Sequence, residues 1–183
     1  FLVALSDGMG SGDAARDVSA RTLSLLESFY KTGMPSDTVL ATVNSLIAYS
    51  ADERFSCLDL AAVNLDDGST DIVKIGSPAG FLLSQDELKI LEGESLPIGV
   101  LDAVHPATMR LTMQENDFLL FMSDGISAAF SSSADLCAYL GELRPLNPQA
   151  LAENVLSAAL ARSAKGEAGD DMTVLAVKLT AAA

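Results

Sequence analysis

The sequence has few of the residues on which several common kinds of site depend. Its 183 residues include two cysteines, one histidine and no tryptophan, and 11 Lys or Arg against 25 Asp or Glu. Two isolated cysteines, Cys57 and Cys137, are too few for a disulfide scaffold, so we expect a reducing compartment. With His105 as the only histidine, a zinc site is excluded. A net charge of −14 provides no basic surface for nucleic acid or an anionic membrane.

Long apolar runs are also missing. No segment reaches the roughly 18 consecutive apolar residues that a membrane span needs, and we expect no signal peptide within residues 1–183. Hydrophobic residues make up 49% of the chain and charged residues 20%, which is typical of a folded domain. We therefore expect one domain over residues 1–183. Because Phe1 lies inside an expected strand, we also expect a fragment of a longer protein.

The hydrophobic pattern predicts an order of strand, two helices, a run of strands, two helices and a last strand. Strands joined by hairpins, with helices in separate blocks, favour an α+β fold with antiparallel sheets. Helices are expected from residue 14 to before Gly33, from Ser36 or Asp37 as the cap to about residue 50, at 134–144 and at 147–164. Strands are expected at 1–6, 56–65, 70–75, 80–83, 88–91, 107–113, 117–123 and 172–180.

Three acidic turns lie at strand ends. Ser6-Asp7-Gly8 and Ser123-Asp124-Gly125 each follow an apolar run, and Asp170-Asp171 precedes the last strand. Hard divalent cations prefer carboxylate, carbonyl and water oxygens, so three converging turns of this kind would bind Mg²⁺ or Mn²⁺. Asp-Gly is also a common turn dipeptide. Composition and spacing alone therefore leave both a simple turn and a metal site open.

Four motifs in order resemble one enzyme family. They are Ser6-Asp7-Gly8-Met9-Gly10-Ser11-Gly12, residues 55–61 (FSCLDLA), residues 122–126 (MSDGI) and residues 170–174 (DDMTV). The series is similar to that of the bacterial metal-dependent Ser/Thr protein phosphatases, the PPM family. Within it, the subgroup of the stage II sporulation protein E phosphatase domain is the most similar, and the stretches 74–77 (KIGS) and 96–99 (LPIG) match this subgroup too.

The resemblance implies a fold and a set of site residues. The fold would be an α-β-β-α sandwich of two antiparallel sheets flanked by helices. Asp7 would bridge two Mn²⁺ or Mg²⁺ ions, Gly8 would give its backbone carbonyl to one of them, and Asp124 and Asp170 would be further acidic ligands. Asp171 would support them. The family's first acidic motif has no counterpart here, so we expect that the chain lacks the first strands and at least one ligand.

The resemblance also implies a reaction and partners. The enzyme would hydrolyse phosphoserine or phosphothreonine by attack of a metal-bridging hydroxide. The substrate would be a phosphorylated anti-sigma factor antagonist during sporulation. The chain would be a cytoplasmic domain, with any membrane anchor outside it. We further hypothesise regulation through the helices in 14–50, by homodimer contacts that include Leu26 and Phe29.

Other interpretations remain. The strand, glycine loop and helix are also found in nucleotide-binding modules, but residues 8–13 lack the third glycine of GxGxxG and no P-loop lysine is present. A non-catalytic scaffold with the same fold is the main alternative. Arg16 and His105 are expected to be solvent-exposed rather than catalytic.

Overall fold

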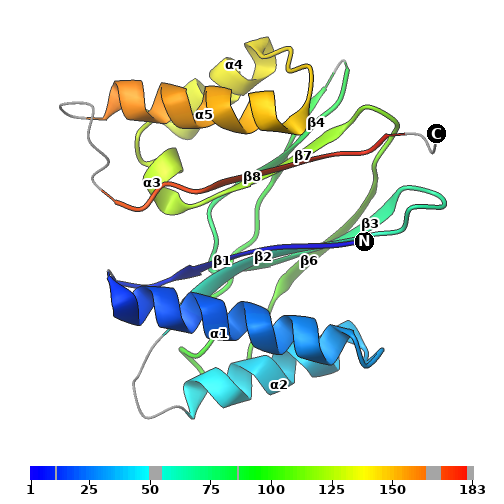
Figure 1. The fold of residues 1–183 in the computed structure, drawn as a ribbon, viewed down its shortest axis with the longest axis vertical. Coiled ribbons are helices and arrows are strands. Elements are labelled where there is room, and N and C mark those ends of the chain that lie inside the picture. The colour runs from blue at the N-terminus through cyan, green and yellow to red at the C-terminus, as the bar shows by residue number, and fades with distance from the viewer. Residues whose placement is uncertain (11, 50–54, 86, 164–169, 181–183) are drawn as a thin grey trace. The chain divides into compact units, whose positions relative to one another are not determined.

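The computed structural model describes residues 1–10, 12–49, 55–85, 87–163 and 170–180. The helices and strands follow one another along the chain in the predicted order, with one short additional helix, α3, after β7 (Figure 1). Their bounds are β1 Leu2–Gly8, α1 Asp13–Tyr30, α2 Ser36–Ala48, β2 Ser56–Val63, β3 Ser69–Ile75, β4 Gly80–Leu83, β5 Leu88–Leu91, β6 Ala107–Thr112, β7 Phe118–Met122, α3 Asp124–Ser127, α4 Ser133–Glu142, α5 Pro148–Arg162 and β8 Val174–Lys178.

Two antiparallel sheets confirm the predicted α+β class. One sheet has the strand order β1-β2-β3-β6, and the other has the order β5-β4-β7-β8. The chain divides into two compact units, each built around one of these sheets. The first unit comprises residues 1–63, 70–77 and 93–111, and the second comprises 64–69, 78–92 and 112–183.

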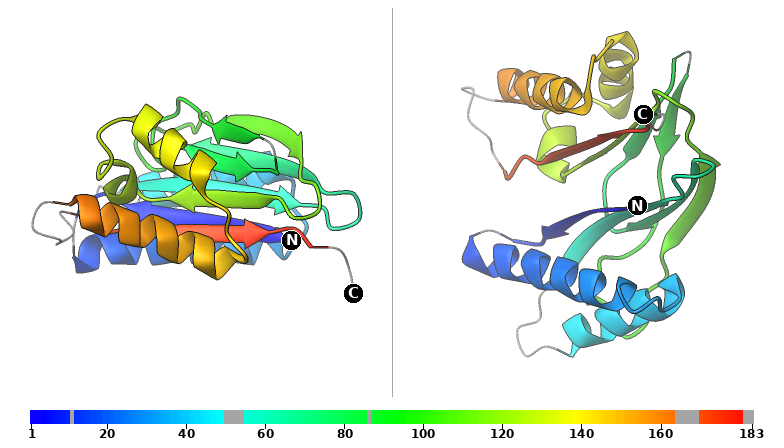
Figure 2. Two further views of the ribbon diagram at one scale, coloured as in Figure 1. Left: turned by 90° about the horizontal axis from the view of Figure 1, so that it is seen from above. Right: turned by 45° about the vertical axis from the view of Figure 1, so that its right-hand side comes forward.

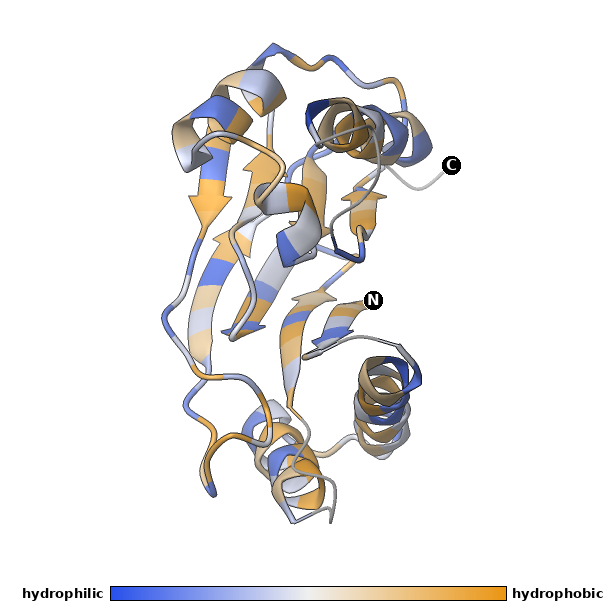
Figure 3. Ribbon diagram, turned by 90° about the vertical axis from the view of Figure 1, so that its left-hand side faces the viewer, coloured by the Kyte–Doolittle hydropathy of each residue, from blue (hydrophilic) through white to orange (hydrophobic). Residues whose placement is uncertain are grey.

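In the first unit, α1 and α2 cover one face of the sheet (Figure 2). The buried residues of α1 recur every three or four positions, at Ala15, Val18, Thr22 and Leu26, which is the spacing of one helical face. Figure 3 shows hydrophobic and hydrophilic residues together on these helices. Leu26 is 1% exposed, so the expectation that it makes homodimer contacts is wrong: it packs into the unit's own core.

The start of α2 also differs from the prediction. Pro35 is the N-cap residue, and neither Ser36 nor Asp37 caps the helix with its side chain. The Ser36 hydroxyl instead shares a 2.7 Å hydrogen bond with the Tyr30 hydroxyl. This hydrogen bond therefore connects the end of α1 to the start of α2. The fixed φ of Pro35 is compatible with a helix start.

In the second unit, α3, α4 and α5 pack on the sheet and share a core with it. Every residue of β7 is buried, which explains the continuous apolar run in its sequence. The α5 helix starts as predicted, because Asn147 accepts a hydrogen bond from the Ala150 amide at 2.8 Å and Pro148 occupies the first turn. No helix among the described residues is long and apolar enough to cross a membrane.

A buried ion pair joins two strands of the first unit. Asp59 and Lys74 face each other across β2 and β3, and they are 1% and 0% exposed. The Lys74 ammonium donates to the Asp59 carboxylate, which also accepts a 2.7 Å hydrogen bond from Ser77. Burial raises the pKa of Asp59, and Lys74 and Ser77 act against that rise. The Asp59 carboxylate can thus be buried because Lys74 and Ser77 replace the hydrogen bonds that water would otherwise donate to it.

We predict that Lys74→Met strongly destabilises the fold. The change leaves the buried Asp59 carboxylate without its cation, which should lower the free energy of unfolding by about 3–5 kcal/mol at neutral pH. Without Lys74 the pKa of Asp59 rises further, so the folded state gains a proton as the pH falls. The deficit relative to the unmodified protein should therefore be smaller in acid. Urea denaturation at several pH values measures it.

The matched control is the double variant Asp59→Asn with Lys74→Met. It keeps an acceptor for Ser77 and removes both charges, so it should recover much of the lost stability. A double variant as unstable as Lys74→Met alone would show that the loss comes from packing rather than from an unpaired charge.

Candidate active site

The first candidate segment is the end of β1. Asp7 pairs with Cys57 and Gly8 with Ser56 across the β1–β2 ladder. The Ser56 hydroxyl contacts the Asp7 carbonyl at 3.1 Å and the Ser6 hydroxyl at 2.6 Å. Ser56 is fully buried. The backbone that carries Asp7 is therefore held from the neighbouring strand.

Gly8 is required by a close approach rather than by a turn. A Cβ atom at this position would lie 2.1 Å from the Ala15 carbonyl oxygen and 2.7 Å from a Val18 methyl carbon. Gly8 is not among the glycines with positive φ. Its missing side chain lets the end of β1 lie against the first turns of α1, directly beside the predicted ligand Asp7.

The second candidate segment is the end of β7. The ladder between β7 and β8 ends at the pair Met122 and Val174. The chain then turns into α3, a single helical turn that the hydrophobic pattern does not predict. Asp124 occupies its first residue and is exposed, whereas the flanking Ser123 and Gly125 are buried. A carboxylate therefore reaches solvent from a rigid and buried support.

The Asp170-Asp171 segment lies directly against this turn. The Ser123 hydroxyl donates to the Asp171 carbonyl at 2.9 Å. A Cβ atom at Gly125 would lie 2.5 Å from the same carbonyl oxygen and 3.4 Å from the Asp170 carbonyl carbon. Gly125, like Gly8, does not have positive φ. The structure thus brings together the segments that carry Asp124 and Asp170.

The donor set suits a hard divalent cation. Asp124 and Asp170 are exposed carboxylates from adjacent segments, and oxygen ligands are those that Mg²⁺ and Mn²⁺ prefer. Asp7 and Gly8 belong to the other compact unit. Among the residues that the structure describes, no group of three or more His, Cys, Asp or Glu side chains is arranged so that it could hold a metal ion. The assignment of Asp7, Gly8, Asp124 and Asp170 as ligands stays a prediction.

The two cysteines do not have the environment of a nucleophile. The Cys57 thiol donates to the Gly76 carbonyl at 2.9 Å. Burial, with Glu92 nearby, raises the pKa of the Cys137 thiol, so this thiol is protonated at neutral pH. Because the thiolate is the reactive form, neither cysteine is suited to covalent catalysis. Arg16 and His105 are exposed, as expected.

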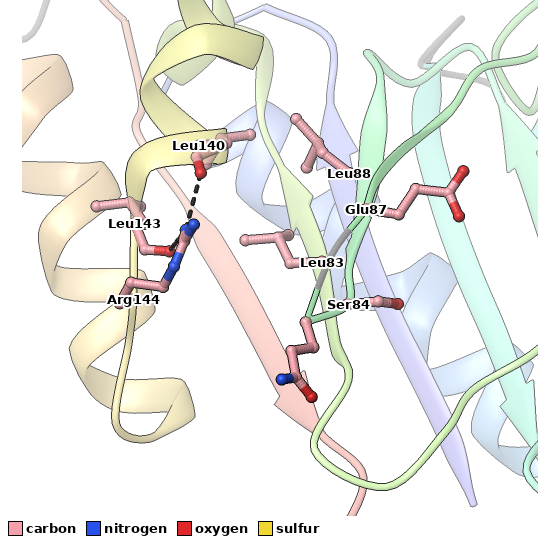
Figure 4. Close-up of a pocket in the computed structure, with 9 residues that line it drawn as sticks. Leu83, Ser84, Glu87, Leu88, Leu140, Leu143 and Arg144 are labelled. Atoms are coloured by element: carbon pink, nitrogen blue, oxygen red, sulfur yellow. Dashed lines mark hydrogen bonds between the residues drawn. The ribbon is translucent and has the colours of Figure 1, made fainter.

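Two cavities of the second unit lie next to α4. One, of 330 Å³, lies between the β4–β5 turn and the end of α4 (Figure 4). Arg144 lines it and donates to the carbonyls of Gly141 and Leu143 at 2.8 and 2.7 Å, and none of the predicted ligands takes part. The other, of 180 Å³, is lined by Ser127, whose hydroxyl donates to the Asp124 carbonyl at 3.0 Å. The smaller of these two cavities therefore adjoins the turn of Asp124.

Comparison with known proteins decides the family. The model of the stage II sporulation protein E (SpoIIE) family matches residues 1–180. The chain belongs to this family. Stage II sporulation protein E of Priestia megaterium is 32% identical and that of Bacillus subtilis (strain 168) is 31% identical, each over 98% of this chain. The chain spans only 31% and 22% of the length of these two relatives.

Solved structures agree on the fold. The PP2C phosphatase domain of SpoIIE from Bacillus subtilis, solved with a fragment of its regulatory domain, superposes with a TM-score of 0.86 at 30% identity. The match covers 98% of this chain and 53% of that one. PppA of Pseudomonas aeruginosa superposes with a TM-score of 0.76 at 20% identity, over 97% and 85% of the two chains. The predicted resemblance to the SpoIIE phosphatase domain is confirmed, and so is the predicted α+β fold with two antiparallel sheets.

We predict that Gly125→Ala destabilises this site. The new Cβ atom would push the Asp171 backbone away, and such overpacking costs about 1–3 kcal/mol in the free energy of unfolding. Gly141→Ala is the matched control, because a Cβ atom there meets nothing within 4 Å and alanine favours the α4 helix by up to about 1 kcal/mol. Urea denaturation compares the two. Equal losses in both variants would contradict the close packing at Gly125.

Proposed function

We propose that this chain is the catalytic part of a metal-dependent phosphatase that acts on phosphoserine or phosphothreonine in proteins. The observation that carries the proposal is the contact between the turn of Asp124 and the segment of Asp170. Carboxylate oxygens are ligands that hard divalent cations prefer, and the turn and the segment carry two exposed carboxylates. Membership of the SpoIIE family supports the same reaction class.

In this proposal Asp7, the Gly8 carbonyl, Asp124 and Asp170 hold two Mn²⁺ or Mg²⁺ ions. When bound, such ions lower the pKa of water towards neutrality and offset the charge of the phosphoryl group. The residues of the chain orient these ligands: Ser56 holds the Asp7 backbone, and Gly125 admits the Asp171 backbone. The attacking group is water, which agrees with the lack of a reactive thiol at Cys57 and Cys137.

The substrate is proposed from the family. A phosphorylated anti-sigma factor antagonist would present its phosphoserine to the exposed carboxylate turn through the bound cations. The cations are necessary for this encounter because a chain with a net charge of −14 repels a phosphorylated and therefore anionic surface. Regulation of a sigma factor during sporulation, and a membrane anchor elsewhere in the full protein, belong to the same proposal.

We predict that Asp124→Asn abolishes most of the activity. The amide keeps the shape of the side chain but removes its charge, so phosphate release from an aryl phosphate and from a phosphoserine peptide in Mn²⁺ should fall on the order of a hundredfold or more. Excess EDTA should have the same effect on the unmodified protein. Asp66→Asn, an exposed carboxylate of the β2–β3 turn, is the control and should keep full activity.

The same assay separates the enzyme from the alternative of a non-catalytic scaffold. A scaffold would release no phosphate with either substrate, with or without Mn²⁺. Activity that ignores both EDTA and Asp124→Asn would contradict the proposed site. A phosphorylated anti-sigma factor antagonist that is not dephosphorylated, beside an active aryl phosphatase, would overturn only the proposed substrate.

A homodimer through the helices in 14–50 is also proposed, with α2 as the contact. Tyr49 is 78% exposed and Leu46 is 41% exposed, so both offer apolar surface. We expect Tyr49→Lys to raise the dimer dissociation constant by about tenfold, measured by analytical ultracentrifugation over a range of concentrations. Thr38→Lys adds the same charge at an exposed position of α2 and should have little effect. Purely monomeric unmodified protein would refute the dimer.

A further inference from the structure

Ser123 lies between the buried strand β7 and the candidate ligand Asp124, and its hydroxyl makes two hydrogen bonds. Its Oγ donates to the Asp171 carbonyl at 2.9 Å and accepts a hydrogen bond from the Thr173 amide at 2.9 Å. Its own amide donates to the Thr173 carbonyl at 3.0 Å. Ser123 is 2% exposed. The hydroxyl itself is therefore shielded from water by the surrounding protein.

The Ser123 hydroxyl connects the two chain segments beyond the point where the β7–β8 ladder ends. The last ladder pair joins Met122 to Val174, so residues 170–173 lie outside strand β8. The bonds of Ser123 are the described hydrogen bonds that tie residues 171 and 173 to the β7 side. Without them, the short segment before β8 would be attached there only by packing, such as that against Gly125.

The Asp171 peptide links this attachment to the neighbouring carboxylate. The Asp171 carbonyl accepts from Ser123, while the Asp171 amide donates to the Asp170 Oδ1 atom at 2.8 Å. The two groups flank a single Cα atom, so a change in the Asp171 backbone also alters the donor that orients the Asp170 carboxylate. The direction of that carboxylate thus depends on a hydroxyl that it does not touch.

We propose that Ser123 is a positioning residue of the cation site. It acts through Asp171 to hold the Asp170 carboxylate beside Asp124, and so it sets the affinity for the divalent cation. The inference rests on the proposed function, since it takes Asp124 and Asp170 as ligands. Loss of the hydroxyl removes the side-chain partner of the Asp171 carbonyl and of the Thr173 amide. The cation must then order a segment that the hydroxyl otherwise holds in place.

The test uses the full-length protein and Mn²⁺ alone as the probe. Isothermal titration calorimetry should show that Ser123→Ala raises the dissociation constant for Mn²⁺ by about 10–100-fold, the range typical of groups that orient metal ligands. Phosphate release from an aryl phosphate should need correspondingly more Mn²⁺ for half-maximal rate. At saturating Mn²⁺, kcat should approach that of the unmodified protein, because Ser123 touches neither cation nor substrate.

The controls separate positioning from general stability. Ser163→Ala removes another partly buried hydroxyl, which bonds the Ala159 carbonyl at 3.0 Å, and should leave Mn²⁺ binding unchanged. Ser123→Thr keeps a hydroxyl and should bind Mn²⁺ more tightly than Ser123→Ala. An unchanged Mn²⁺ affinity in Ser123→Ala overturns the inference. An unchanged affinity and rate in Asp124→Asn instead overturns the proposed function on which it rests.

If Ser123→Ala does not fold, amide hydrogen exchange in the unmodified protein still tests the inference. In EDTA, the Thr173 amide of the unmodified protein should exchange its hydrogen far more slowly than an exposed amide, because it donates to the buried hydroxyl. Rapid exchange of this amide would show that the attachment does not exist before the cation binds, and would refute the inference.

Discussion

The antiparallel pairing of β7 with β8 is the interaction on which the candidate site depends. All of β7 is buried, so its position is fixed by the core of its unit rather than by polar contacts. The pairing brings together two chain segments that are far apart in the sequence, and it ends at Met122 and Val174. The next residue beyond the ladder is polar on each strand: Ser123 follows Met122, and Thr173 precedes Val174. The carboxylates of Asp124 and Asp170 are therefore positioned by the core without being buried in it.

The repeated Ser-Asp-Gly tripeptide has a common physical basis in the two units. In each copy the glycine permits a close backbone approach, of Gly8 to Ala15 and of Gly125 to Asp171. Neither glycine has the positive φ that many Asp-Gly turns require. A simple turn would need the glycine for its backbone angles. Here the missing side chain matters instead, because it lets a second segment lie against the glycine, one residue after the aspartate.

Much of the fold could be predicted from the sequence, because apolar periodicity and turn residues are local signals. The strand Phe118–Met122 and the start of the helix at Pro148 are examples. The α3 turn was missed because four residues give no periodicity. The pairing of Asp59 with Lys74 was missed for another reason: strand register decides which side chains meet. The hydrogen bonds of Ser123 with Asp171 and Thr173 also depend on long-range register, that of β7 against β8.

Burial separates the acidic residues of this chain into two roles. Asp59 lies inside the fold with a permanent cation, Lys74, so its charge is already balanced. Asp124 and Asp170 are exposed, and water lowers the cost of placing their segments together before any cation is present. The support of Asp124, from Met122 to Ser123, is buried. The backbone of this turn is therefore positioned by the core of its unit, and the exposed carboxylate extends from that core towards solvent.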